Sequence, residues 1–325
     1  MQEIIQKILE KIEKKDNDEL LSDISEGPNI KFDGKNFFDF SAKKSEKKIA
    51  FVDGGNLEIL KTPSISLFFN RIYYTIYQNN KRIENKKFEF YSLIYSSDKN
   101  NKLVYKTEYF FTVGKFEFKE YEFDSFDKKI TFGNRRAKIS LIGNIIRRFA
   151  ELKIASSIDA DFVVLDGSLE ATYPFEEELI KNAMLNSVLC GISKTTELLT
   201  KYGNSVTAYL LNMTNKKEWY YYCTKAKDYK TYFAKLHPKS KYVFRIDIAK
   251  ETVDELFGLL KENSKDAVFI GYPYGLVEAD RFARVSQREK DMLKIQLEAR
   301  AKKNFEKLLP YIKSIDAHDV LDNIG

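Results

Sequence analysis

The sequence predicts an α/β protein in which helices flank a mixed sheet. Two short apolar runs, Ile49 to Val52 and Phe162 to Leu165, each lead into an aspartate followed by a glycine, at Asp53 and Asp166. Four consecutive apolar residues leave no polar side for water, so both runs are typical of strands buried on both faces. Between them, alternating apolar and polar residues indicate an antiparallel meander, and a helical apolar period follows.

The composition is that of a globular protein with a small excess of positive charge. The chain has 325 residues, of which 43% are hydrophobic, enough to fill a substantial core. Its net charge of +6 is compatible with a polyanionic partner but does not identify one. The two cysteines, Cys190 and Cys223, and the two histidines, His237 and His318, are too dispersed to predict a zinc site. Without a visible signal peptide or a run of about 18 apolar residues, we expect a reduced, cytoplasmic protein.

The first 47 residues are expected to form a helix and a polar connector. Isoleucine and leucine recur on one stripe of residues 2–15, opposite lysine and glutamate, which predicts an amphipathic helix that needs a partner surface. Residues 16–47 are polar and lysine-rich, as is typical of a connector. We therefore predict an N-terminal helix and connector over residues 1–47 and one large domain over residues 48–325.

Antiparallel strands and one helix are predicted between the two aspartates. Turn residues such as Asn79-Asn80 separate the alternating runs. The predicted strands cover residues 65–77, 88–95, 103–113 and 116–123. Apolar residues at helical spacing then predict a core-facing helix over residues 135–156.

After Asp166, helices and strands are predicted to alternate. The predicted helices cover residues 175–189 and 250–262, with a helical and highly charged tail over residues 276–315. The predicted strands cover residues 188–192, 206–211, 220–224, 242–248 and 267–271.

Each aspartate is predicted to mark the exit of its strand. Gly54 and Gly55 lack side chains, so the chain can turn sharply there or approach a phosphate or metal closely. A single aspartate in this position usually accepts hydrogen bonds from backbone N–H groups of a turn. Two of them on parallel neighbouring strands would place both carboxylates at one edge of the sheet, and Mg²⁺ and Mn²⁺ prefer carboxylate oxygens. The pattern therefore predicts a divalent-metal site at Asp53 and Asp166.

The order of these elements is the topology of the ribonuclease H-like fold: a strand with an aspartate, antiparallel strands, a helix, and a second strand with an aspartate. In that topology a glutamate on the helix completes the metal site, and the helix here offers Glu151. An ordinary ion pair with Arg147, one turn away, is the alternative interpretation of Glu151. Glu117, Glu120 and Glu122 in the meander are rival ligands.

Four segments together indicate a family. They are FVDGG at 51–55, VVLDGSL at 163–169, GYPYGLVEADRFARV at 271–285 and AHDVLD at 317–322. On these segments the chain resembles the NurA-type archaeal nucleases over nearly its whole length. The resemblance implies a ribonuclease H-like core, Mn²⁺-dependent cleavage of DNA and a homodimer. It also implies partnership with the hexameric HerA-type DNA-translocating ATPase in DNA double-strand-break end resection.

The resemblance implies site residues as well. Matched position by position, the metal ligands are Asp53, Glu151, Asp166 and His318, which would hold one or two Mn²⁺ ions, with Mg²⁺ as the alternative. His318 lies among three aspartates, which suits either a metal ligand or a proton carrier. Lys194 resembles a family lysine near the cleft and could hold a phosphate as a point charge.

Four further residues are candidates for contacts with DNA. Tyr173 and Phe175 follow the second aspartate and could stack a base at the mouth of the cleft, with core packing as the equal alternative. Arg281 and Arg284 lie about one helical turn apart and could contact the phosphate backbone. Pairing with acidic residues on the same helix is the simpler interpretation of these two arginines.

The sequence thus predicts a metal-dependent DNA nuclease, for which the resemblance implies 5′ to 3′ exonuclease and single-strand endonuclease action. Two other classes stay open. One is a non-catalytic adaptor of the same fold that binds DNA or an ATPase, and it would lack divalent-dependent cleavage. The other is a ribonuclease H-like enzyme acting on RNA or an RNA/DNA hybrid, which matched oligonucleotides would distinguish.

Overall fold

The structure of the chain is a computed structural model that describes residues 5, 7, 19–20, 30–40, 45–196, 198–250, 253–301 and 306–307. The chain folds into two compact units whose segments alternate along the sequence. Unit 1 comprises residues 1–47, 164–169 and 188–274, and unit 2 comprises residues 48–163, 170–187 and 275–325. Strand β9 (Phe162–Asp166) contributes residues to both units.

Unit 2 is built on a sheet with the strand order β9-β4-β5-β6-β7-β8. From β4 to β8, successive strands pair antiparallel. Asn79-Asn80 and Asn100-Asn101 form the two tight turns of this meander, with φ between 52° and 61°. Asparagine tolerates this left-handed backbone, which two-residue hairpin turns require. The bounds are β4 Ile49–Lys61, β5 Ile65–Gln78, β6 Lys81–Lys99, β7 Lys102–Val113 and β8 Glu122–Asp124.

The starts of β4 and β9 lie beside each other in unit 2. The carbonyl oxygen of Lys48 accepts hydrogen bonds from the backbone N–H groups of Asp161 and Phe162, each at 3.1 Å. The backbone N–H of Lys48 in turn donates to the Asp161 carboxylate at 2.9 Å. Because these neighbouring strands begin at the same level, they run in the same direction.

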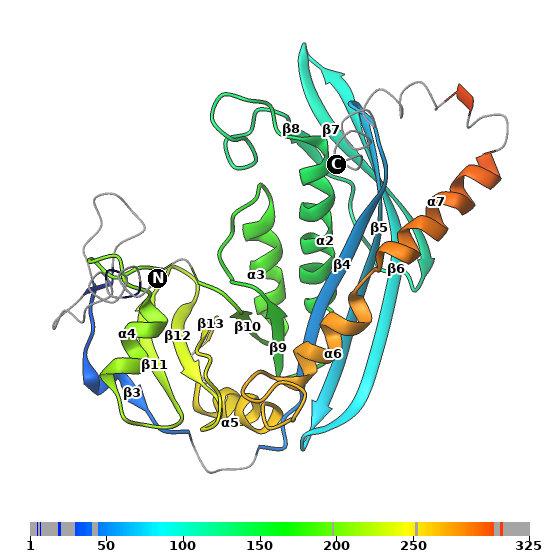
Figure 1. Ribbon diagram of the computed structural model, residues 1–325. Coiled ribbons are helices and arrows are strands. Elements are labelled where there is room, and N and C mark those ends of the chain that lie inside the picture. Colours follow the sequence, from blue (N-terminus) through cyan, green and yellow to red (C-terminus); the bar gives the residue numbers. More distant parts are fainter. Residues whose placement is uncertain are drawn as a thin grey trace. The chain divides into compact units, whose positions relative to one another are not determined.

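Helices cover both faces of the unit 2 sheet (Figure 1). Side chains alternate along a strand, so Gly54, Asn56 and Glu58 of β4 face α2, and the residues between them face α6 and α7. Asn56 donates to the Gly143 carbonyl of α2 at 3.0 Å, and Ser140 of α2 donates to Glu58 at 2.9 Å, which fixes the first turns of α2 on β4. The bounds are α2 Ile139–Ala155, α3 Glu176–Asn186, α6 Tyr274–Ala283 and α7 Gln287–Ala301.

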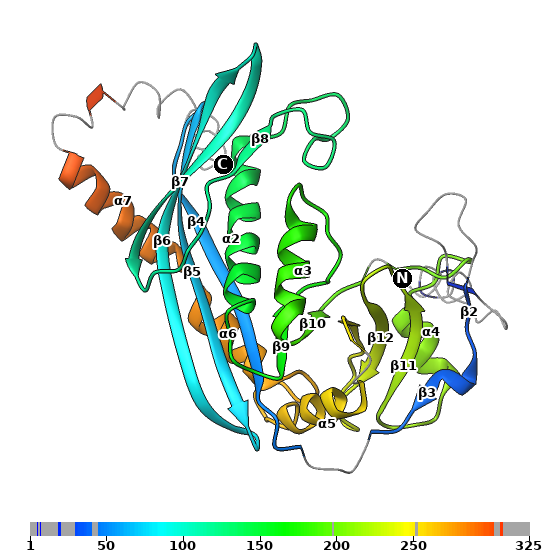
Figure 2. The same ribbon diagram turned by 180° about the vertical axis from the view of Figure 1, so that it is seen from behind.

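Unit 1 contains strands in the order β3-β11-β12-β13-β10-β9, and its pairs from β3 to β10 are antiparallel. Helix α4 packs with Trp219, Tyr221 and Phe233 on one face (Figure 2). Tyr220 points the other way and stacks on Phe257 of α5 with ring centroids 4.2 Å apart. The bounds are β1 Glu19–Leu20, β2 Ile30–Lys31, η1 Gly34–Asn36, β3 Phe37–Phe38, β10 Val188–Ser193, α4 Val206–Met213, β11 Trp219–Lys225, β12 Lys230–Lys235, β13 Phe244–Ile248 and α5 Val253–Asn263.

The predicted fold class, a mixed sheet with an antiparallel meander and flanking helices, is confirmed, whereas three element predictions are wrong. Residues 206–211, expected as a strand, lie in α4, because Val206 and Leu210 are buried at helical spacing. Residues 267–271, expected as a buried strand, form turns that expose most of their side chains. Of residues 116–123, only the end belongs to a strand, β8.

Parts of two predicted helices lie outside the described residues. Most of the N-terminal helix predicted over residues 2–15 belongs to this group, as do residues 302–305 and 308–315 of the predicted tail. In the described part, the tail consists of α6 and α7 with a break at residues 284–286. Among the helices that the structure describes, none has the length and apolarity needed to cross a membrane.

One arginine ties the break between α6 and α7 to the sheet. Arg71 on β5 pairs through Nε with Glu89 on β6 at 2.7 Å and through its guanidinium with Glu289 on α7. Its Nη1 donates to the carbonyl oxygen of Arg284, just after α6 ends, at 2.9 Å. The guanidinium presents five donors in a fixed fork, so a single side chain holds two strands and two helices together.

Replacing Arg71 by methionine is expected to lower the free energy of unfolding by about 3 kcal/mol at pH 7, because Glu89 would keep a largely buried charge without this cation. Burial raises the pKa of the Glu89 carboxyl, but Lys87 and Arg71 outweigh burial and lower it. The stabilisation is therefore complete above the pKa of an unfolded glutamate, about 4.3, and is lost as the pH falls through the lower folded value. Urea unfolding of the wild type and the variant at pH 7 and pH 3 measures the difference in the free energy of unfolding.

The matched control is Lys87→Met. Lys87 also pairs with Glu89, at 2.9 Å, but its side chain is 44% exposed. Its loss is expected to cost less than about 1 kcal/mol, as is usual for exposed ion pairs. Equal costs for the two variants, or a cost of Arg71→Met that does not change with pH, would contradict this account.

Candidate functional site

Asp53 lies within a long strand rather than at its end. Strand β4 continues through Gly54 and Gly55 to Lys61, so the prediction that the strand ends and the chain turns here is wrong. The reason is pairing: β5 is hydrogen-bonded to β4 on both sides of the glycines, which keeps the backbone extended. Asp53 is 7% exposed, and its carboxylate accepts the backbone N–H of Gly54 at 2.7 Å.

Gly54 leaves room for Glu151 of α2. A Cβ atom at position 54 would lie 2.5 Å from Oε1 of Glu151, so the glutamate occupies the space of the absent side chain. Glu151 is 2% exposed and pairs with Arg147 and, at 3.6 Å, with Arg148. Arg147 also donates to the Gly54 carbonyl oxygen at 3.0 Å. The ion pair with Arg147 therefore exists, in a buried setting directly beside the DGG segment.

Gly55 leaves room for the end of α6 on the opposite face of β4. A Cβ atom at position 55 would collide with the carbonyl oxygen of Ala283. This close approach brings a carboxylate of α6 to the strand: oxygens of Asp280 and Asp53 lie within 4.8 Å of each other. Asp280 also pairs with Arg284, one turn further along the chain, at 2.8 Å.

Asp166 lies at the end of β9, in unit 1. Its carboxylate pairs with Nζ of Lys194 at 2.6 Å, and the same ammonium lies 5.6 Å from the centre of the Tyr272 ring. The turn after Asp166 is held in place by Asp247, which is fully buried and accepts the backbone N–H of Leu169 at 3.2 Å. The structure thus brings the predicted acid and the predicted lysine together within this unit.

Two of the four predicted DNA contacts, Phe175 and Arg284, have side-chain partners within unit 2. The ring of Phe175 packs against Tyr121 and Phe123, with centroids 5.6 Å apart in both pairs, yet the residue stays 43% exposed. Its φ of 68° is uncommon for a large side chain. Tyr173 is half-buried, and Arg281 is exposed.

The remaining predicted ligands separate into two groups. His318 lies outside the described residues. Of the rival acids in the meander, Glu117 and Glu120 are exposed, and Glu122 on β8 pairs with Lys99 at 2.6 Å.

The sequence interpretation missed Asp280 as a site residue and took it only as a partner for an arginine. The available signal was a stripe of small residues, Gly275, Ala279 and Ala283, that recurs every four positions. Small residues at this spacing allow a helix to lie very close to a sheet, and Ala279 and Ala283 pack on Tyr73 of β5. An acid beside such a stripe is a candidate for a site at the strand.

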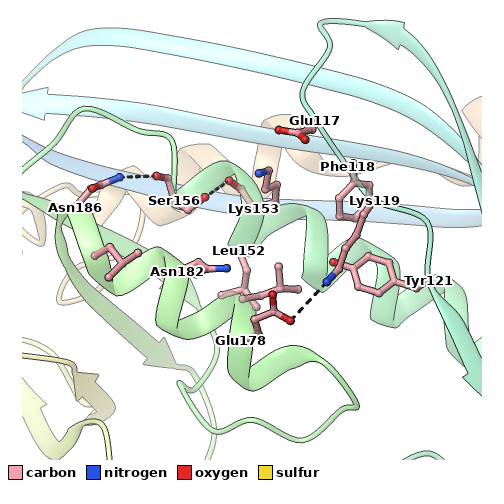
Figure 3. Close-up of a pocket in the computed structure, with 12 residues that line it drawn as sticks. Glu117, Phe118, Lys119, Tyr121, Leu152, Lys153, Ser156, Glu178, Asn182 and Asn186 are labelled. Atoms are coloured by element: carbon pink, nitrogen blue, oxygen red, sulfur yellow. Dashed lines mark hydrogen bonds and ion pairs between the residues drawn. The ribbon is translucent and has the colours of Figure 1, made fainter.

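A separate pocket of about 360 Å³ lies in unit 2 between α2, α3 and the segment before β8 (Figure 3). Lys119 pairs with Glu178 across it at 3.5 Å and lies 5.3 Å from the centre of the Tyr121 ring. Asn186 donates to the Ser156 carbonyl at 3.2 Å. Lys119, Glu178 and Asn186 therefore have partners within the lining of the pocket.

The chemistry of the acids beside β4 fits a hard divalent cation. Two ionised carboxylates this close repel each other unless a cation lies near both. Burial of Asp53 increases that cost, because a desolvated charge needs compensation. Mg²⁺ and Mn²⁺ prefer carboxylate oxygens and complete their coordination shell with water or substrate phosphates. Asp53 and Asp280 could therefore hold such an ion.

Comparisons with known proteins identify a family and a shared fold. A family model described as the NurA domain matches residues 47–285. No curated protein sequence matches the chain. Among solved structures, the NurA nuclease from Sulfolobus solfataricus has a TM-score of 0.51 at 14% identity, covering 83% of this chain and 89% of that one. At this identity the likeness shows a shared fold.

Two endonuclease V structures are also similar. One, from Ciona intestinalis in complex with a 24mer DNA, has a TM-score of 0.40 at 11% identity and covers 77% of this chain and 87% of that one. The catalytic domain of the human enzyme has a TM-score of 0.39 at 8% identity, with 81% and 92% covered.

Replacing Gly54 by alanine is expected to lower the free energy of unfolding by about 1 to 3 kcal/mol, because the new methyl group overlaps Glu151 in a packed core. Urea unfolding measures the loss. In a double-mutant cycle, the same substitution should cost less when Glu151 is already alanine. The control is Gly34→Ala, since a Cβ there meets nothing within 4 Å. An equal loss of free energy of unfolding on Gly54→Ala in the wild type and in Glu151→Ala would contradict the proposed contact between position 54 and Glu151.

Proposed function

The chain belongs to the NurA family, and from this premise we propose that it is a nuclease that cleaves DNA with the help of a bound divalent cation. The observation that carries the proposal is the pair of carboxylates, Asp53 and Asp280, within 4.8 Å of each other in the matched region. A buried aspartate held this close to a second acid carries an electrostatic cost that a solvated surface pair does not, and this supports a role of the pair in binding a cation.

We infer that Asp166 is the third acid of the same centre. Strands β4 and β9 are neighbours whose starts coincide, so their residues advance together along the sheet. Each reaches its aspartate four residues after its start, from Ile49 to Asp53 and from Phe162 to Asp166. This equal count supports Asp166 as a further acid of the proposed centre.

Mn²⁺ is the proposed ion, with Mg²⁺ as the alternative and one or two ions per site. When bound, such an ion lowers the pKa of a coordinated water and stabilises the leaving oxygen of the phosphodiester. The acids supply the charge and geometry that hold it. Glu151 is proposed as a further ligand on the family resemblance alone, since Arg147 and Arg148 hold its carboxylate beside Gly54, on the face of β4 opposite Asp280.

Other side chains are proposed to act on the substrate. Lys194, beside Asp166, would hold a phosphate of the cleaved strand as a point charge. Tyr173 and Phe175 would stack bases, and Arg281 and Arg284 would contact the phosphate backbone, as in single-strand channels that combine cations with aromatic rings. His318 is proposed as a fourth ligand or as the proton carrier.

The wider role is proposed from the family resemblance. It comprises 5′ to 3′ exonuclease and single-strand endonuclease action in double-strand-break end resection, by a homodimer that works with a HerA-type hexameric translocase. The isoleucine stripe of residues 2–15 is a proposed docking helix for one of these partners.

Substituting Asp53, Asp166 or Asp280 by asparagine is expected to abolish divalent-dependent cleavage or reduce it at least about 100-fold, because each change removes a ligand charge at nearly constant shape. The measurement is a gel assay on labelled single- and double-stranded DNA, RNA and hybrid, with Mn²⁺, Mg²⁺ and chelator in parallel. Asp98→Asn, at an exposed position of the β6–β7 hairpin, is the control that should keep full activity.

The wild-type lanes decide between the classes of protein. DNA binding without cleavage under either metal would make the chain an adaptor, and cleavage of RNA or hybrid alone would make it a ribonuclease. Wild-type turnover by any of the three asparagine variants would remove that acid from the centre.

His318 is expected to act at the site, and pH separates its two proposed roles. A ligand must be neutral, so cleavage should fall as the pH drops through the imidazole pKa, about 6.5, and excess Mn²⁺ should move that fall to lower pH. A proton carrier lost as His318→Ala should slow cleavage by about 10² to 10⁴-fold without changing the Mn²⁺ concentration for half activity. Rates unchanged by His318→Ala at every pH and Mn²⁺ concentration would show that it has neither role.

A further inference from the structure

A buried glutamate of α6 receives three hydrogen bonds from the meander. Glu278 is 4% exposed. Its carboxylate accepts the hydroxyl groups of Tyr73 at 2.8 Å and Tyr77 at 2.5 Å, both on β5, and Nη1 of Arg82 on β6 at 2.8 Å. A buried carboxylate costs several kcal/mol unless it is paired and hydrogen-bonded, and these three donors meet that need.

Tyr73 connects this carboxylate to the metal-binding strand. In the register of β4 and β5, Tyr73 is the direct partner of Asp53. Its ring stacks on Phe282 of α6, with centroids 5.1 Å apart and an interplanar angle of 28°. One hydrogen bond therefore joins the cross-strand neighbour of Asp53 to a helix residue two positions before Asp280.

Close contacts at both ends hold α6 against β4. At the start, a Cβ at Gly275 would collide with the ring of Phe51, and at the end Ala283 lies against Gly55. These are contacts between small residues and apolar or backbone atoms, which do not by themselves set the rotation of a helix about its axis. Hydrogen bonds to Glu278 are directional, so they constrain that rotation and with it the direction of the Asp280 carboxylate.

We propose that Glu278 is a positioning residue for the metal centre, which holds Asp280 at the distance from Asp53 that a divalent cation requires. The inference rests on the proposed function, since it needs the acids to bind an ion. Partners that orient metal ligands typically contribute 10- to 100-fold in affinity. A merely structural Glu278 would affect stability and leave the affinity of the folded protein for metal unchanged.

The test measures Mn²⁺ binding by titration calorimetry on the full chain without DNA. Glu278→Gln and Tyr73→Phe are each expected to raise the dissociation constant for Mn²⁺ at least about 10-fold. Cleavage should recover when Mn²⁺ is raised to saturation. Hydrogen exchange of the metal-free protein should be faster at the amides of α6 in both variants.

Tyr74→Phe is the matched control. Tyr74 follows Tyr73 on β5, is buried to a similar degree, and donates its hydroxyl to a glutamate too, Glu84, at 2.6 Å. Its side chain points to the other face of the strand, away from α6, so its loss should leave Mn²⁺ affinity unchanged within about twofold. The Asp53→Asn variant shows which part of the heat of Mn²⁺ binding comes from this site, because that part should be lost in it.

The outcomes separate the two proposals. If the wild-type protein binds no Mn²⁺ or Mg²⁺, the proposed metal centre fails and the role of Glu278 fails with it. If the wild type binds and Tyr73→Phe binds equally well, the centre stands and the positioning role is overturned. Tyr73→Phe keeps the test decisive even where Glu278→Gln does not fold, because it removes a single hydroxyl group.

Discussion

Unit 2 depends on how closely two helices approach strand β4. Gly54 leaves space on one face for a carboxylate of α2, and Gly55 leaves space on the other for the last turn of α6. Neighbouring residues of a strand face opposite ways. Two consecutive glycines therefore leave both faces of the sheet without a side chain at the same position along the strand. The atoms that fill these spaces are a glutamate held by two arginines and a backbone carbonyl, neither of which moves easily. Glu151 and Asp280 reach the strand because of this approach.

Paired charges in the interior hold these helices in position. Glu151 is held by arginines of its own helix, Glu278 by two tyrosines and an arginine of the meander, and Arg71 by two glutamates. Buried ionic groups often contribute little net stability, because desolvation offsets their attraction, whereas breaking one pair leaves an uncompensated charge. Such pairs resist sliding and rotation of a helix more than apolar contacts do, since hydrogen bonds are directional. A centre that must hold acids at defined separations needs that resistance.

Periodicity was sufficient for most of the fold and failed where a segment was short. The long alternating strands of the meander and the helix that carries Glu151 were predictable because their patterns extend over many residues. Residues 206–211 form an apolar run too short to distinguish a strand from a helix. In residues 267–271, which are turns, Phe269 stacks on Tyr242 with ring centroids 5.4 Å apart, an aromatic contact that hydrophobicity alone cannot separate from burial in a sheet.

The sequence by itself determined that Asp53 and Asp166 end apolar runs and that a helix between them carries Glu151, because local patterns of apolar residues set burial and direction. Only the tertiary structure decided that β4 continues past its glycines, since pairing with β5 keeps it extended. Only the tertiary structure selected Asp280 and Glu278 from the many acids of the tail. Whether a helical acid faces a strand more than 200 residues earlier in the chain depends on the rotation of that helix, which we attribute to the directional hydrogen bonds of Glu278 with tyrosines of β5.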